Sequence, residues 1–128
     1  MAIDLRRRHG ELGEKIAAEH LEHRGFSIVA RNFRTRYGEL DLIVADDRSL
    51  VFCEVKTRIA GTRGGPDGPF DAIGPKKRLR LRRMALQWLA EAPAADRPHR
   101  QELRFDAVGI VLSPAGRLLA LEHLEDAF

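Results

Sequence analysis

The sequence predicts a mixed α/β domain in which helices flank a sheet, with its elements in the order α-β-β-β-α-β-β. Apolar residues recur at helical spacing in two segments, and they alternate or run continuously in five shorter segments. The length of 128 residues suits one domain with its own core. We therefore expect residues 1–128 to form a single domain.

The first half of the chain predicts one helix and three strands. The helix is expected at residues 10–23 and ends before Gly25, which suits the position after a last helical turn. Residues 26–33 predict a strand, and residues 39–57 predict a β-hairpin.

The second half predicts a loop, a helix and two strands. Residues 59–74 are rich in glycine and proline, which favours a loop. The second helix is expected at 75–91, because proline suits its first turn and Pro93 stops it. Strands are expected at 103–112 and 117–124.

The charge pattern points to a polyanionic partner. The net charge is only +3, but the cations are clustered at 6–8 and 76–83. Such clusters favour nucleic acid, because phosphate binding releases counterions. The alternative is a pair of solvated helix faces, and composition alone does not choose between them. On the second helix we expect one basic flank, formed by Lys76, Arg80, Arg83 and Gln87.

Other features favour a cytoplasmic protein with no membrane partner. The single cysteine, Cys53, excludes an internal disulfide and a cysteine-based zinc cluster, and fits a reducing compartment. Basic residues near the N-terminus precede no apolar signal-peptide core, and no apolar run reaches the roughly 20 residues of a membrane span.

The hairpin carries acids where strands usually carry apolar residues. With a two-residue turn at Asp47-Arg48, one face is wholly apolar. Its expected pairs are Val44–Val51, Leu42–Cys53 and Leu40–Val55. The other face is apolar near the turn and charged at the far end, where the expected pairs are Asp41–Glu54 and Glu39–Lys56.

Two carboxylates directly across a strand pair repel each other by roughly 3 kcal/mol at about 5 Å and an effective dielectric of about 20. Protonation of one acid, neutralisation by Lys56, or binding of a divalent cation would relieve this repulsion. Because Lys56 already faces Glu39, the Asp41–Glu54 pair is under-compensated. Oxygen ligands favour Mg²⁺ or Mn²⁺. A surface salt-bridge ladder is the alternative.

An acid, a second acid and a lysine across a hairpin, after a helical glutamate, resemble the PD-(D/E)XK nuclease superfamily with its restriction-endonuclease-like fold. The chain also resembles the UPF0102 family of bacterial proteins over nearly its whole length. The segments that carry this resemblance are GELGEKIAAEHLEHRGFSIVARNFR, GELDLIVAD, VFCEVKTR, RFDAVGIV and LEHLEDAF. One departure from the superfamily pattern is Leu40, which stands where a proline would precede the first acid.

The resemblance implies a role for each matching residue. It makes Asp41 and Glu54 metal ligands, with the backbone carbonyl of Val55 as a third oxygen. It makes Lys56 the group that orients the attacking water and stabilises transition-state charge. Glu14 would hold a metal-bound water or a second ion.

Further residues match as supporting groups. Lys77 would contact phosphate at the start of the second helix, beside the basic flank. Glu39, Arg58 and Arg104 would support the site or contact the nucleic-acid backbone. We expect Cys53, Trp88 and Phe52 to lie in the core and the five histidines to lie on the surface. Tyr37 is the aromatic residue best placed to meet a substrate.

The resemblance and the residues together predict a metal-dependent DNA endonuclease of the PD-(D/E)XK type. Few aromatic residues and no recognition-helix pattern favour selection of junctions, flaps or ends, as in recombination or repair. RNA remains open as a substrate, and a resolvase-like enzyme would be a homodimer. The alternative function is a non-catalytic nucleic-acid-binding accessory protein in recombination or DNA uptake.

Overall fold

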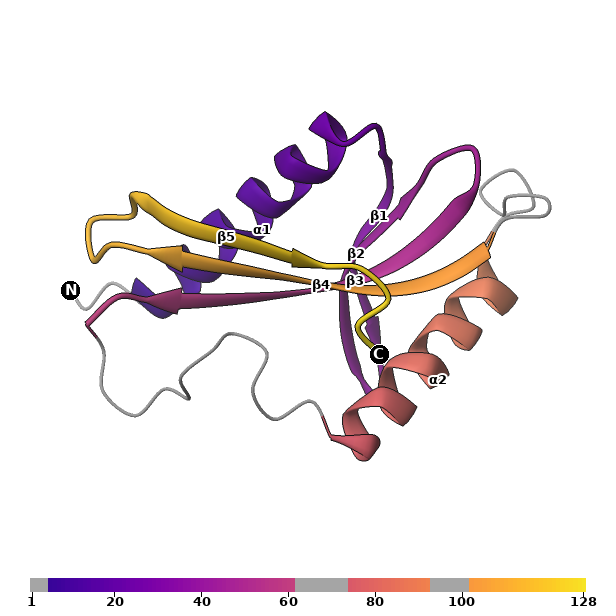
Figure 1. Ribbon diagram of the computed structural model, residues 1–128. Helices are drawn as coiled ribbons and strands as arrows, with labels where there is room; N and C mark the ends of the chain where they lie inside the picture. The colour runs from indigo at the N-terminus through magenta and orange to yellow at the C-terminus, as the bar shows by residue number, and fades with distance from the viewer. Residues whose placement is uncertain (1–4, 62–73, 93–101) are drawn as a thin grey trace.

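The computed structural model describes residues 5–61, 74–92 and 102–128 (Figure 1). The helices are α1 (Leu5–His23) and α2 (Pro75–Glu91). The strands are β1 (Ser27–Thr35), β2 (Gly38–Ala45), β3 (Ser49–Ile59), β4 (Glu102–Leu112) and β5 (Leu118–Leu124). The mixed α/β class and the order α-β-β-β-α-β-β are thereby confirmed.

The five strands form one mixed sheet in the order β1-β2-β3-β4-β5. All neighbours are antiparallel except β3 and β4, which are parallel. A parallel pair requires a long crossover connection, and α2 lies in it. The two helices cover opposite sides of the sheet (Figure 1). Neither described helix is apolar enough over a bilayer's width to span a membrane.

Each helix closes a separate hydrophobic core. The core under α1 is built from residues that include Ala17, Leu21 and Cys53. The core under α2 includes Trp88 and Phe52, whose ring centroids lie 5.9 Å apart in an edge-on arrangement. The expected core positions of Cys53, Trp88 and Phe52 are confirmed.

Several predicted boundaries differ from the structure: β1 ends at Thr35 and not at residue 33, β4 and β5 each begin one residue away from the expected position, and two further differences concern the first helix and β3. The first helix begins at Leu5 and not at residue 10, so that it includes the positions before Gly10. Strand β3 extends to Ile59, paired with Leu112 of β4, so the expected loop starts later. Most of that loop, 62–73, lies outside the described residues.

The hairpin register is confirmed near the turn and wrong farther from it. The β2–β3 ladder runs from Ala45↔Leu50 to Leu42↔Cys53. Beyond that point β2 stays paired with β1, and β3 stays paired with β4. The two central strands therefore diverge, and we call this divergence the fork. The expected cross-strand pairs Asp41–Glu54, Leu40–Val55 and Glu39–Lys56 do not form in the ladder.

The expected face of Leu40 is also wrong. Leu40 packs with Ile43 in the core under α2, although residues three apart in a regular strand face opposite sides. Their partners on β1 are Phe33, opposite Leu40, and Ala30, opposite Ile43. Both partners pack on the same side as Leu40 and Ile43. Between them Asn32 adopts φ 51°, a left-handed conformation that asparagine tolerates better than most residues. This kink in both strands breaks the alternation at the fork.

Candidate active site

Four acids gather at the fork: Glu14 of α1, Glu39 and Asp41 of β2, and Glu54 of β3. We call them the acidic cluster. The charges of the other three act on Asp41 and raise its pKa. The structure therefore brings together all four acids that the sequence analysis singled out.

Asp41 bridges the two diverging strands. Its Oδ2 accepts a hydrogen bond of 2.8 Å from the backbone N–H of Val55. That N–H lies beyond the end of the β2–β3 ladder, where the carboxylate replaces a strand partner. Burial is the main cause that raises the pKa of Asp41 to about 7, and the Val55 bond opposes this shift only in part.

Glu54 is held by the second helix. Its Oε1 lies 2.6 Å from Nζ of Lys77, and the two side chains are 22% and 26% exposed. The resemblance implies that Lys77 contacts phosphate, and the sequence predicts an under-compensated acid pair. In the structure Lys77 supplies part of that compensation, because the crossover places the first turn of α2 beside β3.

Asn32 is a site residue that the sequence analysis missed. When its side-chain nitrogen faces the acids, it donates to Oε1 of Glu39 at 2.9 Å and to Oε2 of Glu14 at 3.1 Å. This orientation satisfies the amide and both carboxylates. An asparagine in the middle of an expected strand is the signal that could have identified it, because the amide is unfavourable in a regular strand.

A close helix–strand contact positions Glu14. A Cβ atom at the neighbouring Gly13 would overlap the Thr57 hydroxyl of β3 and lie 3.0 Å from its Cβ and Cγ2. Only glycine permits α1 to approach β3 this closely. Burial, together with the charges of Glu39 and Glu11, raises the pKa of Glu14.

Lys56 is exposed to solvent. Thr57 meets α1 and Glu54 meets α2, so strand alternation places Lys56 on the α2 side with Glu54. Arg58 lies farther along β3, opposite Val111 of β4. Lys76, Arg80 and Arg83 are exposed on α2, in agreement with the expected basic flank.

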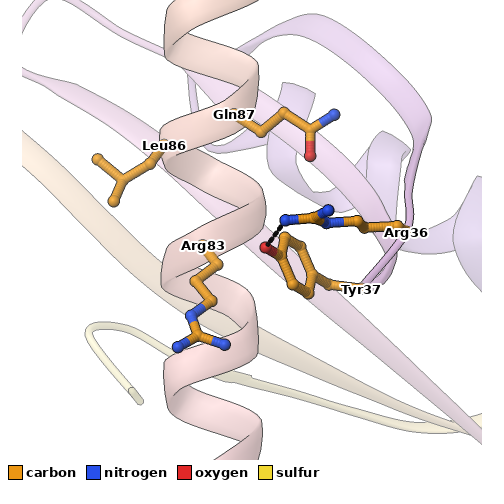
Figure 2. Close-up of a pocket in the computed structure, with 5 residues that line it drawn as sticks. All are labelled: Arg36, Tyr37, Arg83, Leu86 and Gln87. Atoms are coloured by element: carbon orange, nitrogen blue, oxygen red, sulfur yellow. Dashed lines mark hydrogen bonds between the residues drawn. The ribbon is translucent and has the colours of Figure 1, made fainter.

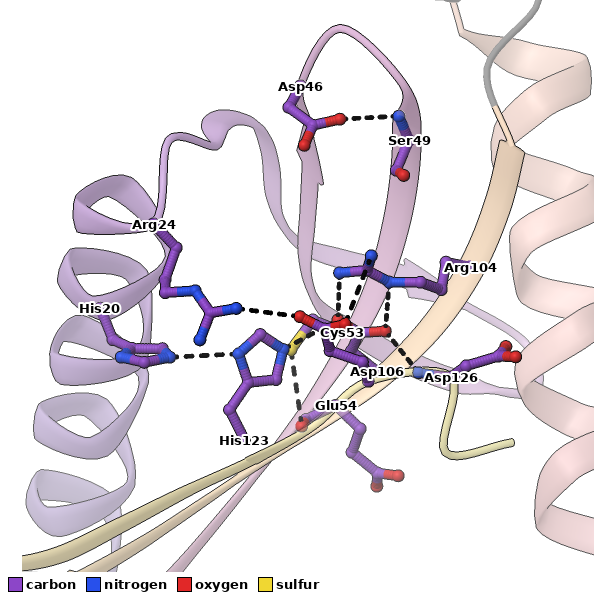
Figure 3. Close-up of polar contacts among 11 residues, drawn as sticks. His20, Arg24, Asp46, Ser49, Cys53, Glu54, Arg104, Asp106, His123 and Asp126 are labelled. Atoms are coloured by element: carbon purple, nitrogen blue, oxygen red, sulfur yellow. Dashed lines mark hydrogen bonds and ion pairs between the residues drawn. The ribbon is translucent and has the colours of Figure 1, made fainter.

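Arg104 belongs to a second polar cluster (Figure 3). Its Nε and Nη2 donate to the two carboxylate oxygens of Asp106 at 2.9 and 2.8 Å. The same carboxylate, which is fully buried, meets Nε2 of His123 at 2.8 Å and the backbone N–H of Asp126 at 2.9 Å. Burial would raise the pKa of Asp106, but these hydrogen bonds lower it below its usual value. Arg104 thus fastens the C-terminal segment through Asp106.

The expected surface position of the histidines is wrong for two of them. His9 is buried and approaches the carbonyl oxygen of Pro114 at 3.2 Å. The side chain of His123 is 5% exposed and lies 3.1 Å from the ring nitrogen of His20. His99 lies outside the described residues. Both buried rings contact partners more than 100 residues away, so local sequence patterns carry no signal for them.

The acidic cluster has the chemistry of a site for a hard cation. Its donors are oxygens, as Mg²⁺ and Mn²⁺ prefer, and Lys77 is the cation seen paired with them in the described residues. Across the described ranges, however, no three Asp, Glu, His or Cys side chains converge as a complete ligand set. Asp41 is held by Val55, Glu54 by Lys77, and the two remaining acids by Asn32. The donor set therefore suits a divalent cation in its chemistry, while each acid is engaged by another group of the chain.

Comparison with known proteins identifies related sequences. The model of a family described as "Uncharacterised protein family UPF0102" matches residues 13–110. The chain is 44% identical over 128 residues to a UPF0102 protein of Frankia alni, with 100% of both chains covered. It is 47% identical to UPF0102 proteins of Frankia casuarinae, over 93% of this chain and 94% of the relative, and of Nocardia farcinica, over 93% and 87%.

Proposed function

The chain belongs to the UPF0102 family, and from its acidic cluster we propose that it is a metal-dependent nuclease that hydrolyses phosphodiester bonds in DNA. The proposed site is of the PD-(D/E)XK type. Its substrates would be branched or terminal structures, such as junctions, flaps or ends in recombination or repair. RNA is the competing substrate.

One observation carries the proposal. Four acids from α1, β2 and β3 lie near enough for the charges of Glu14, Glu39 and Glu54 to act on Asp41, although like charges repel. The effect is visible at Asp41, whose pKa is raised to about 7 by burial and by the three other acids. Locally unfavourable electrostatics of this kind concentrate at functional sites.

The residues divide the work between cation and substrate. Asp41 and Glu54 would hold the metal with the carbonyl of Val55, and Glu14 would hold a bound water or a second ion. A divalent cation held by these residues would supply Lewis acidity, which lowers the pKa of water and screens phosphate charge. Lys56, which is exposed and on the same side of β3 as Glu54, would orient the attacking water and stabilise the charge of the transition state.

The exposed cations of α2 would hold the DNA backbone. Lys76, Arg80 and Arg83 lie on the helix whose first turn carries Lys77, so phosphates bound along α2 lead to the acidic cluster. Contacts of this kind position a duplex and do not read its sequence.

The test measures cleavage of labelled single-stranded, duplex, flap and four-way-junction DNA and matching RNA, with Mg²⁺ or Mn²⁺. We expect Asp41→Ala and Lys56→Ala each to lower the cleavage rate by about 100-fold or more. Asp47→Ala and Lys15→Ala remove the same charges from exposed positions outside the cluster, and should cut at the wild-type rate. Equal cleavage by all five proteins would assign the activity to a contaminant.

A non-catalytic accessory protein that binds nucleic acid is the second candidate. It is favoured by the ion pair between Lys77 and Glu54, because the ammonium group occupies a carboxylate that a metal would need. Binding of DNA by wild type, without cleavage of any substrate in either metal, would support this candidate over the nuclease.

A further inference from the structure

A surface pocket lies between the β1–β2 turn and α2 (Figure 2). It has a volume of about 540 Å³ and is lined by Arg36, Tyr37, Arg83, Leu86 and Gln87. This volume is within the range of small-ligand sites, roughly 300–1,000 Å³. We propose that this pocket binds one unpaired nucleotide of a nucleic-acid strand, with its base against Tyr37 and its phosphate on the arginines. The inference rests on the proposed nucleic-acid substrate and specifies its form.

The pocket is built around an aromatic ring flanked by cations. Cζ of Arg36 lies 4.9 Å from the centroid of the Tyr37 ring, and Cζ of Arg83 lies 5.7 Å from it. Nη2 of Arg36 also donates to the Tyr37 hydroxyl at 2.7 Å. Unpaired bases bind proteins by stacking on such rings and guanidinium planes.

The remaining walls suit a base as well. Leu86 is 64% exposed and offers an apolar surface that has no role in the core. Nε2 of Gln87 donates to Glu91 at 3.2 Å, which leaves the amide oxygen to accept a bond from a base edge. The five lining residues include two cations and no acid, so the pocket favours an anionic ligand.

The turn that carries Tyr37 is fixed against α2. The backbone N–H of Tyr37 donates to Oγ1 of Thr35 at 3.0 Å, and that hydroxyl donates to the carbonyl of Gly38 at 3.1 Å. Gly38 has φ 136°, and a Cβ there would lie 3.7 Å from the sulfur of Met84. A turn held in this way presents the ring at little ordering cost.

The pocket is close to the acidic cluster along both elements. Tyr37 precedes Glu39 by two residues, so their Cα atoms are at most about 7 Å apart. On α2, Arg83 follows Lys77 by six residues, a rise of about 9 Å along the axis. A nucleic-acid strand with one phosphate at the acidic cluster can therefore place a neighbouring base in the pocket.

Duplex DNA does not satisfy this pocket. Paired bases expose only their edges in the grooves, while their faces are covered by stacking. A ring that binds a base face therefore selects a flap, an overhang or another unpaired segment. The pocket would thus make the protein prefer nucleic acid with unpaired segments, whatever its base sequence.

The test compares two labelled DNA hairpins, one blunt and one with a single-stranded overhang, by fluorescence anisotropy in EDTA, where no metal-dependent cleavage takes place. Tyr37→Ala should weaken overhang binding by about 5- to 100-fold and blunt binding by less than about twofold. Arg83→Ala, a change at an exposed position, should weaken overhang binding more than blunt binding, because Arg83 lines the pocket and is also one of the α2 cations that hold the DNA backbone. Arg78→Ala, outside the pocket on the same helix, should weaken both probes equally.

An abasic scan of the overhang identifies the bound nucleotide. At one position, removal of the base should weaken wild-type binding as much as Tyr37→Ala does, with no further loss when both changes are combined. Equal effects of the pocket variants on both probes, or no sensitive abasic position, would overturn the inference. Because no cleavage is required, a preference for overhangs in a protein that cuts nothing would overturn the nuclease and leave the pocket standing.

Discussion

Lys77 and Glu54 form an ion pair of 2.6 Å that joins the first turn of α2 to β3 at the acidic cluster. The ammonium group stands where a divalent cation would draw on the same carboxylate. In the proposed nuclease, metal binding would therefore be a competition between Lys77 and the incoming ion.

Replacement of Lys77 by methionine tests this competition. We expect Lys77→Met to bind Mn²⁺ roughly tenfold more tightly by calorimetric titration, because the ion no longer displaces an ammonium group. The free energy of unfolding should fall by about 1 kcal/mol or less, since both groups are about a quarter exposed. Arg78→Met should leave Mn²⁺ affinity unchanged, and the same result for Lys77→Met would contradict the competition.

The stability of the metal-free protein should fall between about pH 4 and pH 7. The pKa of Asp41 rises from 3.8 to about 7 on folding, so the folded protein retains a proton that the unfolded chain releases in this window. The stabilisation is complete below the unfolded pKa and is lost as pH rises through the folded pKa. It amounts to roughly 4 kcal/mol at most.

Denaturant unfolding in EDTA at pH 5 and pH 8 measures this effect. Wild type should lose roughly 2–3 kcal/mol more than Asp41→Asn between the two values. Asp47→Asn, at an exposed position in the hairpin turn, should follow wild type. A wild-type protein that loses no more than Asp41→Asn would show that Asp41 ionises normally.

Asn32 can be changed in two ways that separate its backbone from its side chain. Asn32→Gly keeps the left-handed conformation and removes the amide, so the free energy of unfolding should stay within about 1 kcal/mol of wild type. Asn32→Asp adds a fifth carboxylate beside the cluster and should raise the pKa of Asp41 by about one unit, followed by carbon NMR of the carboxylates. An unchanged pKa in Asn32→Asp would place this side chain away from Asp41.

Two glycines of α1 provide a matched test of the contact that positions Glu14. Gly10→Ala meets nothing within 4 Å and should stabilise the protein by about 0.5–1 kcal/mol. Gly13→Ala should instead cost about 1–3 kcal/mol, because its Cβ overlaps Thr57. Thr57→Ala removes the hydroxyl and should recover part of this loss in the double variant, measured by thermal unfolding. Equal stabilisation by both alanines would rule out the close contact.

Several elements were predictable because their signals are local. The second helix has the expected bounds of residues 75 and 91, since proline marks both of its ends. The hairpin register near the turn followed from the alternation of apolar residues around a two-residue turn. Glu39, Asp41 and Glu54 were singled out because charges are unfavourable in otherwise apolar strands, whereas Glu14, on a helix, was singled out by the resemblance to PD-(D/E)XK nucleases.

The contacts of those acids were not predictable in the same way. Regular alternation placed Asp41 opposite Glu54 and Leu40 beside Leu42, but the kink at Asn32 and the fork changed both. The kink rests on one residue, Asn32, because asparagine adopts the left-handed conformation at little cost in free energy. A single residue leaves no signal in the periodicity of the sequence. The same limit applies to Arg104: its partner Asp106 is close in sequence, but Asp106 is also bound by His123 of β5 and by the backbone N–H of Asp126 in the C-terminal segment.

The sequence by itself determined the order of the elements, the apolar faces near the hairpin turn and the identity of the strand acids, because periodicity and charge are properties of neighbouring residues. The tertiary structure alone decided which donor holds each acid. Val55, Lys77 and Asn32 come from β3, α2 and β1, and only the divergence of β2 from β3 opens the space in which they meet the acids. Tyr37 meets Arg83 for the same reason, since the kinked β1–β2 pair carries its turn against α2.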